Sequence, residues 1–296
     1  MSTPRAVVVT RATEYAELLA RHGTRGQAAF FLQTRGRALD EVAARHTATE
    51  AACREVERAI PADWRRAQVE REELSRFVFG PDDVVVVLGQ DGLVANVAKY
   101  LDGQPVIGLD PTPGANAGVL VPHPAAAAGD LLRAVVGGRG RLVERTMVAA
   151  TADDGQTLVA LNEVFVGQPG HQSARYRLAV GGVAERQSSS GLIVGTGTGA
   201  TGWCASLARV QAPGMRLPSP ADPGLAWFVR EPWPSPTTGA DLVAGLLSGE
   251  ERLDVRVESD SLVVFGDGIE ADRLTLTWGQ ELSVCRAPRV LRTVAG

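Results

Sequence analysis

Two glycine-rich turns, each placed directly after an apolar run, constrain this chain more than any other feature. The first is Leu88–Gly92 (LGQDG), which follows Asp83–Val87 (DVVVV), and the second is Gly195–Gly202 (GTGTGATG), which follows Gly191–Val194 (GLIV). A strand that ends in glycines lets a ligand approach bare backbone. The first turn adds the carboxylate of Asp91 and the second adds three threonine hydroxyls. Together they predict a nucleotide site in which Asp91 is the one obvious candidate for chemistry.

The bulk composition is typical of a globular protein with a sizeable core. The 296 residues are 45% apolar and 22% charged, with a formal net charge of -4. This length predicts two domains or one large one, and without a basic field we expect neither nucleic acid nor a membrane as a partner. The three cysteines form no CxxC pair and the four histidines have no metal-ligand spacing. We therefore expect a cytoplasmic protein without disulfides or a protein-built metal site.

The first part of the chain alternates between strand-like and helix-like segments. Apolar runs predict strands, and apolar residues near helical spacing predict the helices between them. The predicted strands are 6–9, 84–88 and 105–109, and the predicted helices are 13–21, 38–60 and 93–101. This rhythm predicts an α/β domain, a parallel sheet with flanking helices, over residues 1–122.

The pattern changes after the turn clusters near Pro111 and Pro122. Short strands separated by glycine turns predict a β-sandwich domain over residues 123–275, with an irregular segment at 213–236 and a helix at 202–208. The predicted strands are 145–151, 157–166, 175–180, 191–195, 253–257, 261–265 and 274–276.

A helix that begins after Gly92 would present unpaired amide N–H groups to an anion. Gly89 and Gly92 would leave room for a phosphate, and Asp91 could orient a metal ion or accept a proton from a substrate hydroxyl. The alternative is that Asp91 and Gly92 form only a helix cap and a turn, because Asp is among the best N-caps. The spacing is neither that of a Walker loop nor that of a dinucleotide fingerprint.

The hydroxyls of Thr196, Thr198 and Thr201 can bond a base or a ribose, while the glycines between them admit a flat ring. Trp203 is either a stacking partner for such a ring or a core residue. A second polar feature, Asn162–Glu163, interrupts the apolar run 157–166. Either one of its side chains points inward and needs a partner such as a ligand, or Glu163 lies in water at a strand edge.

In this order and spacing, the motifs resemble those of the NAD kinase family. The family's GGDG turn corresponds to Gly89–Gly92, its Asn-Glu pair to Asn162–Glu163, and its Gly/Thr-rich segment to Gly195–Gly202. The mitochondrial type of NAD kinase is the most similar branch, on segments such as Leu161–Gly167 and Arg230-Glu231-Pro232.

The resemblance implies ATP with Mg²⁺ as phosphoryl donor and NAD as acceptor, phosphorylated at the adenosine ribose 2′-hydroxyl to give NADP. It implies an active site between the domains, often completed by a partner subunit, and a C-terminal segment, 276–296, that returns to the first domain. By this resemblance Asp91 is the catalytic residue. The nucleotide-binding residues would be Gly89, Gly92, Asn162, Glu163, Thr198, Gly199 and Thr201. We expect a homo-oligomer whose only other partners are small-molecule nucleotides.

The chain departs from the family pattern within the Gly89–Gly92 turn, which would bind the phosphoryl donor, and at two positions after it. Gln90 stands where the family has a second glycine, and a Gln does not easily take a positive φ. Leu93 replaces a Thr, and Asp110 stands where an Asn is common. Two other hypotheses follow: a diverged kinase that phosphorylates a sugar, nucleoside or lipid hydroxyl, and a nucleotide-binding protein without catalysis.

Overall fold

The structure, a computed structural model, describes residues 3–114 and 118–295. The chain forms two compact units, one containing the chain up to Val143 and the segment from Arg292, the other containing Glu144–Leu291. The first is an α/β unit and the second is built of antiparallel sheets, so the predicted fold class is confirmed.

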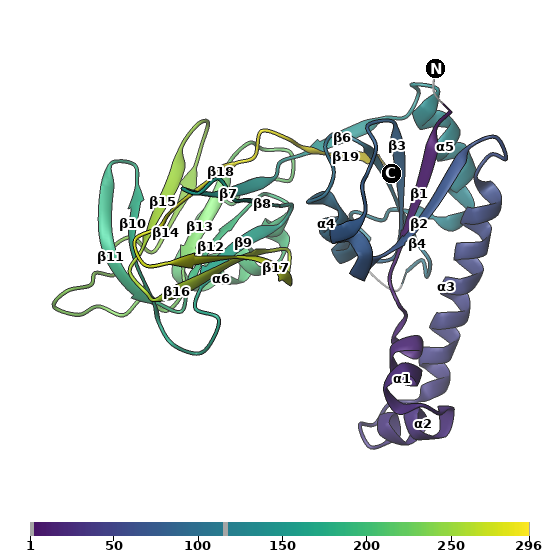
Figure 1. The fold of residues 1–296 in the computed structure, drawn as a ribbon, viewed down its shortest axis with the longest axis horizontal. Coiled ribbons are helices and arrows are strands. Elements are labelled where there is room, and N and C mark those ends of the chain that lie inside the picture. Colours follow the sequence, from purple (N-terminus) through teal and green to yellow (C-terminus); the bar gives the residue numbers. More distant parts are fainter. Residues whose placement is uncertain (1–2, 115–117, 296) are drawn as a thin grey trace. The chain divides into compact units, whose positions relative to one another are not determined.

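The first unit is built on a sheet with the strand order β2-β1-β3-β4-β19-β6, in which β5 pairs with β4 (Figure 1). The pairs β1–β2, β1–β3, β3–β4, β4–β5 and β4–β19 are parallel. All six residues of β3 are buried, as expected for a strand covered on both faces. The strands are β1 (Arg5–Thr10), β2 (Arg65–Glu70), β3 (Asp83–Leu88), β4 (Pro105–Asp110), β5 (His123–Pro124), β6 (Leu142–Arg145) and β19 (Leu291–Val294).

Helices of the first unit bury one core against the sheet and a smaller core away from it. Side chains of β1, β3 and β4 pack with those of α3 and α5, while α1 and α2 pack on one end of the long helix α3 around Leu18, Leu32 and Val42 (Figure 1). Thr13 and Thr24 cap α1 and α2 by accepting backbone N–H groups. The helices are α1 (Glu14–His22), α2 (Arg25–Gln33), α3 (Leu39–Ala59), α4 (Asp91–Ala98) and α5 (Ala128–Val136), with short 3₁₀ turns at Arg71–Arg76 and Ala125–Ala127.

The second unit is a sandwich of two sheets. The β10 sheet has the order β11-β10-β15-β18-β7-β8, and the β12 sheet has the order β14-β13-β12-β9-β16-β17. Both contribute alternate side chains to one core, and α6 covers the other face of the β12 sheet.

The elements of the second unit are β7 (Val148–Ala152), β8 (Thr157–Ala160), β9 (Glu163–Gly167), β10 (Ala174–Val180), β11 (Val183–Ser189), β12 (Leu192–Gly195), a 3₁₀ turn (Gly199–Thr201), α6 (Trp203–Gln211), β13 (Leu225–Val229), β14 (Ala244–Leu247), β15 (Arg252–Val257), β16 (Ser261–Gly266), β17 (Ile269–Thr277) and β18 (Glu281–Arg286).

Several details differ from the sequence predictions. The predicted strand 157–166 is two strands, β8 and β9, which lie in different sheets, and the segment 213–236 contains the buried strand β13. The predicted domain boundaries were 122/123 and 275/276, whereas the compact units divide at 143/144 and 291/292. The reason is that α5 packs on the sheet of the first unit, while β18 pairs inside the β10 sheet. Among the described residues, no helix is both long and apolar enough to cross a bilayer.

Candidate active site

Asp91 is held by the backbone of a neighbouring loop. Its carboxylate accepts hydrogen bonds from the amide N–H of Val119 at 3.0 Å and of Leu120 at 2.8 Å. The N-cap of α4 is Gln90, and Asp91 is the first helical residue. Asp91 is therefore not the N-cap of α4, and its carboxylate bonds the loop instead of the helix N-terminus. A carboxylate has about four lone-pair positions, so each oxygen of Asp91 keeps capacity for a ligand.

A glycine that the sequence analysis did not select makes this arrangement possible. Gly108, in β4, lies directly under the loop, and a Cβ there would overlap the carbonyl oxygen of Leu120 and come within 2.8 Å of its carbonyl carbon. Only a glycine lets the loop approach closely enough for its amides to reach Asp91. The signal in the sequence was a lone glycine inside the apolar strand Pro105–Leu109.

The other residues of the first turn leave space above the backbone. A Cβ on Gly92 would meet no heavy atom of the described residues within 4 Å, and the nearest neighbour of one on Gly89 would be the flexible side chain of Leu93, at 3.0 Å. Gln90 has φ -106°, an ordinary extended conformation. The expected conflict between Gln90 and a positive φ does not arise.

In the second unit, Asn162 lies in a turn and Glu163 is the first residue of the strand that follows it. The chain leaves β8 at Ala160 and enters β9 at Glu163, so it passes from one sheet to the other there. Neither of the two sequence interpretations anticipated this turn. Glu163 is half-buried. Burial first, and then the charge of Asp267, raise the pKa of Glu163 from 4.5 to about 7.

The glycines of the second turn pack against protein backbone. A Cβ on Gly199 would overlap the carbonyl oxygen of Asn162, and one on Gly197 would overlap the carbonyl oxygen of Ser219. A Cβ on Gly195 would overlap the Cys204 sulfur. These three glycines are required by the fold of the unit, and their Cα faces are not open to a flat ring.

The three threonines of this turn have different roles. Thr196 is fully buried, donates to the carbonyl oxygen of Leu161 at 2.5 Å and accepts from the N–H of Thr198 at 3.1 Å. Thr201 is exposed and donates to the carbonyl oxygen of Thr198 at 3.0 Å. The hydroxyl of Thr198 is buried and has no hydrogen-bond partner among the described residues. Such a group is expected to bond a ligand or water.

Trp203 lies parallel to Phe165, with ring centroids 6.0 Å apart, and the Arg230 guanidinium lies 5.4 Å from its ring centroid. It packs on the core beneath α6. This arrangement favours the core interpretation of Trp203. The adjacent Cys204 is fully buried, and its thiol pKa is raised to about 12, by burial first and then by Glu163.

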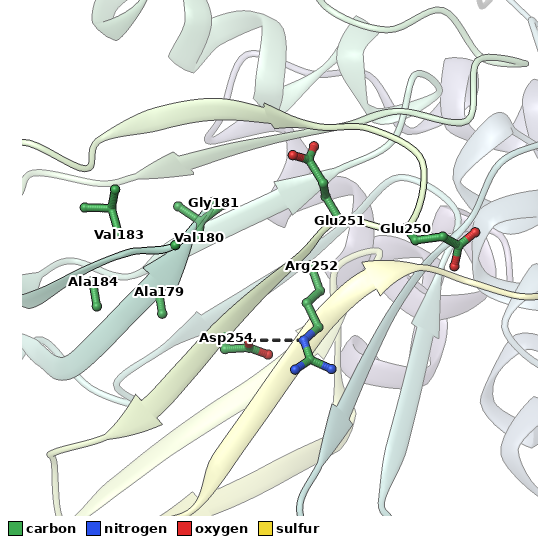
Figure 2. Close-up of a pocket in the computed structure, with 10 residues that line it drawn as sticks. Ala179, Val180, Gly181, Val183, Ala184, Glu250, Glu251, Arg252 and Asp254 are labelled. Atoms are coloured by element: carbon green, nitrogen blue, oxygen red, sulfur yellow. Dashed lines mark hydrogen bonds and ion pairs between the residues drawn. The ribbon is translucent and has the colours of Figure 1, made fainter.

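Within each unit, the structure brings the predicted residues together. Gly89, Asp91 and Gly92 share one turn, and Asn162 and Gly199 touch through their backbones, with Thr198 and Glu163 beside them. A surface hollow of about 520 Å³ in the second unit contains none of these residues. As Figure 2 shows, it lies beside the β10–β11 hairpin and is lined by Glu250 and Glu251 and by the ion pair Arg252–Asp254. Its carboxylates make it a poor site for a phosphate.

The described residues contain no group of three or more His, Cys, Asp or Glu side chains placed to hold a metal ion. Mg²⁺ seldom needs such a cage, because it commonly binds through one or two carboxylates and the phosphates of a nucleotide. Asp91, the first residue of α4 after β3, and the buried Asp110, the last residue of the adjacent strand β4, fit that pattern.

Two of three comparisons with known proteins find kinases that act on NAD or NADH. No protein-family model matches the chain. The chain is 33% identical to the NAD kinase of Geobacter metallireducens and 36% identical to that of Methylococcus capsulatus, each over 133 residues. These matches cover 42% of this chain and 46% and 44% of the relatives, so the chain spans less than half the length of the curated relatives it matches.

A crystal structure of yeast NADH kinase complexed with NADH is similar to the whole chain. The TM-score is 0.61 at 15% sequence identity, over 100% of this chain and 84% of the yeast chain, which shows a shared fold. The likeness to the mitochondrial branch in particular stays a prediction. The two sequence matches and the shared fold confirm the resemblance of this chain to the NAD kinase family.

Proposed function

We propose that the protein is an ATP-dependent kinase that phosphorylates NAD or NADH at the adenosine ribose 2′-hydroxyl, giving NADP or NADPH. One observation carries the proposal: Asp91 is fixed by two backbone amides at the carboxyl end of β3, with open space above Gly92. In parallel α/β sheets, ligands bind at the carboxyl ends of the strands. The curated relatives are NAD kinases, and the solved relative is an NADH kinase.

In the proposed reaction, the 2′-oxygen attacks the γ-phosphorus of ATP, a new O–P bond forms and the bond to the β-phosphate oxygen breaks, releasing ADP. Asp91 accepts or orients the hydroxyl proton. Its amide partners prevent the carboxylate from turning away, so its contribution is positioning more than basicity. Gly89 and Gly92 leave the phosphates room beside the α4 N-terminus, where N–H groups favour an anion.

In the second unit, the buried hydroxyl of Thr198 and the side chains of Asn162 and Glu163 are proposed to bond the hydroxyl and amide groups of the dinucleotide. Thr201 can accept a hydrogen bond because its own proton is used internally. Gly199 serves indirectly, since it lets the Thr198 segment lie on Asn162. Mg²⁺, if it enters with ATP, would be held by the phosphates and by Asp91 and Asp110, and would neutralise charge on the transferred group.

A homo-oligomer in the cytoplasm completes the proposal. An odd number of cysteines, none in a CxxC pair, supports a reducing compartment. Light scattering at two protein concentrations tests the assembly, and a mass of 31.2 kDa at both would contradict it.

The activity is tested by incubating purified protein with ATP, Mg²⁺ and NAD or NADH, followed by chromatography of the products. We expect NADP or NADPH with equimolar ADP, and loss of both with Asp91→Ala. ADP formed only with a panel of sugars, nucleosides or lipids would favour a kinase of another specificity. Binding of NAD without any product would favour a non-catalytic nucleotide-binding protein.

A further inference from the structure

The turn between β16 and β17 carries an aspartate in an unusual conformation. Asp267 has φ 53°, one of two non-glycine residues with positive φ in the described chain, and Gly268 follows with φ 68°. Two consecutive positive φ angles are typical of a type I′ hairpin turn, for which Asp-Gly and Asn-Gly are the preferred pairs. The hairpin alone would therefore be satisfied equally by an asparagine at this position.

The carboxylate of Asp267 does something the hairpin does not require. It accepts hydrogen bonds from the amide N–H groups of Leu161 at 2.8 Å, Asn162 at 2.7 Å and Glu163 at 3.4 Å. In return the N–H of Asp267 donates to the carbonyl oxygen of Glu163 at 3.2 Å. The turn that bears the Asn-Glu pair is thus tied to a residue more than 100 positions later in the chain.

The same turn is held from its other side by the Gly/Thr-rich segment. The N–H of Thr196 donates to the carbonyl oxygen of Asn162 at 2.8 Å, and Gly199 packs on the Asn162 backbone. With both contacts in place, the backbone of Asn162 cannot rotate without breaking bonds on one side or the other. The directions of the Asn162 and Glu163 side chains follow from that fixed backbone.

We propose that Asp267 is the positioning residue for Asn162 and Glu163, holding their backbone in the one conformation from which both side chains reach a bound dinucleotide. The dinucleotide part of this inference rests on the proposed function. The positioning part stands on the hydrogen bonds of the ligand-free protein. Asp267 is not itself a catalytic residue.

The charge of Asp267 has a second effect on the pair. Asp267, from the β16–β17 turn, is the charged group that raises the pKa of Glu163, and Glu163 in turn raises the pKa of the Cys204 thiol, from α6. Because the Asp267 charge contributes to the raised pKa of Glu163, its removal lowers that pKa. A residue that served only the hairpin would leave the titration of Glu163 unchanged when replaced by asparagine.

The test uses Asp267→Asn, which keeps the hairpin but puts an amide NH₂ where a carboxylate oxygen faced an N–H donor. The matched control is Asp154→Asn, since Asp154 also lies in a hairpin turn and accepts a backbone N–H, that of Gln156 at 3.0 Å. Both variants are compared with the wild type by thermal unfolding, by hydrogen exchange of the peptide 158–166, and by NMR titration of Glu163 in protein labelled with ¹³C-glutamate, assigned with Glu163→Gln.

We expect Asp267→Asn to unfold near the wild-type temperature, to exchange the 161–163 amides about tenfold faster, and to lower the Glu163 midpoint from about 7. In the kinase assay, we expect KM for NAD to rise about tenfold with kcat within about threefold. The control should change none of these. Unchanged exchange and an unchanged midpoint in Asp267→Asn would overturn the proposal.

These outcomes separate the inference from the proposed function. If the wild type makes no NADP, the function fails, and the exchange and titration still decide whether Asp267 positions the turn. If Asp267→Asn unfolds, Asp267→Gly keeps a positive φ at no steric cost and replaces it in the same measurements. A loss of kcat with KM unchanged would contradict positioning for binding.

Discussion

Two glycines of the candidate site are expected to respond oppositely to the same substitution. In Gly199→Ala, the new methyl group would overlap the Asn162 carbonyl oxygen and lie 2.8 Å from its carbonyl carbon and 3.1 Å from its Cα, all backbone atoms. Backbone cannot swing aside as a long side chain can. Overpacking of this kind costs about 1–3 kcal/mol, and for units of this size each kcal/mol lowers Tm by about 2–4 °C.

In Gly92→Ala, the methyl group would meet no heavy atom of the described residues within 4 Å, and Gly92 is in α4. Alanine is favoured over glycine inside a helix by about 1 kcal/mol, so the variant should be as stable as the wild type or more so. The space above Gly92 is proposed to be that of a phosphate, so the same methyl group should raise KM for ATP.

Urea unfolding followed by circular dichroism measures the first effect, and steady-state kinetics at varied ATP measures the second. We expect a lower urea midpoint for Gly199→Ala and an impaired enzyme of normal stability for Gly92→Ala. A Gly199→Ala variant as stable as the wild type would refute the assignment of this glycine to the fold. Unchanged ATP kinetics in Gly92→Ala would refute the assignment of the open space to the donor.

Three further outcomes are expected. Asp91→Ala should lower kcat by about 10²–10⁴. Its free energy of unfolding should fall by only about 1–3 kcal/mol, because the Leu120 amide loses its partner. A variant with wild-type activity would contradict the catalytic role of Asp91. The raised pKa of Glu163 means that its contribution to stability is fully present below pH 4.5 and is lost as pH rises through about 7. Urea titrations should therefore show the free energy of unfolding of Glu163→Gln rising relative to that of the wild type between pH 4.5 and about 7, by up to about 3 kcal/mol. A difference that stays constant with pH would contradict the raised pKa of Glu163. Thr198→Val removes a buried hydroxyl without a partner among the described residues, so calorimetry should find weaker NAD binding while thermal unfolding of the ligand-free protein is unchanged or raised; unaltered binding would assign that hydroxyl to water.

The parallel α/β unit could be predicted because its signals are local. The run Asp83–Leu88 is apolar and β-branched throughout, as a strand covered on both faces must be, and the glycines after it mark the turn into α4. The first strand and the long helix α3 follow from equally local patterns. In such segments, neighbouring residues decide the structure, and the rest of the chain only adds packing.

The turn at Asn162 could not be predicted, because residues far away in the sequence produce it. Residues 157–166 contain no Gly or Pro, and their apolar pattern is that of a continuous strand. The amides of the turn are satisfied by Asp267, and its carbonyl by Thr196. Strand β13 was missed for a related reason: its five buried residues lie between proline-rich segments that dominate any local interpretation.

The glycines of the second turn also show how far the sequence alone can predict the site. The sequence indicates that backbone is approached closely at Gly195, Gly197 and Gly199, but it does not say by what. The structure shows that other backbone and the Cys204 sulfur approach them. A ligand therefore has to be recognised by the groups left without partners, of which the Thr198 hydroxyl is the plainest.

We propose that this chain transfers phosphate from ATP to the adenosine ribose of NAD through Asp91. The most direct measurement is the phosphorus NMR spectrum of the product formed from NAD, ATP and Mg²⁺ by the wild type and by Asp91→Asn at equal concentrations. We expect a new 2′-phosphomonoester resonance with the wild type and almost none with Asp91→Asn. A phosphomonoester formed at similar rates by both proteins, or none from the wild type, would contradict it.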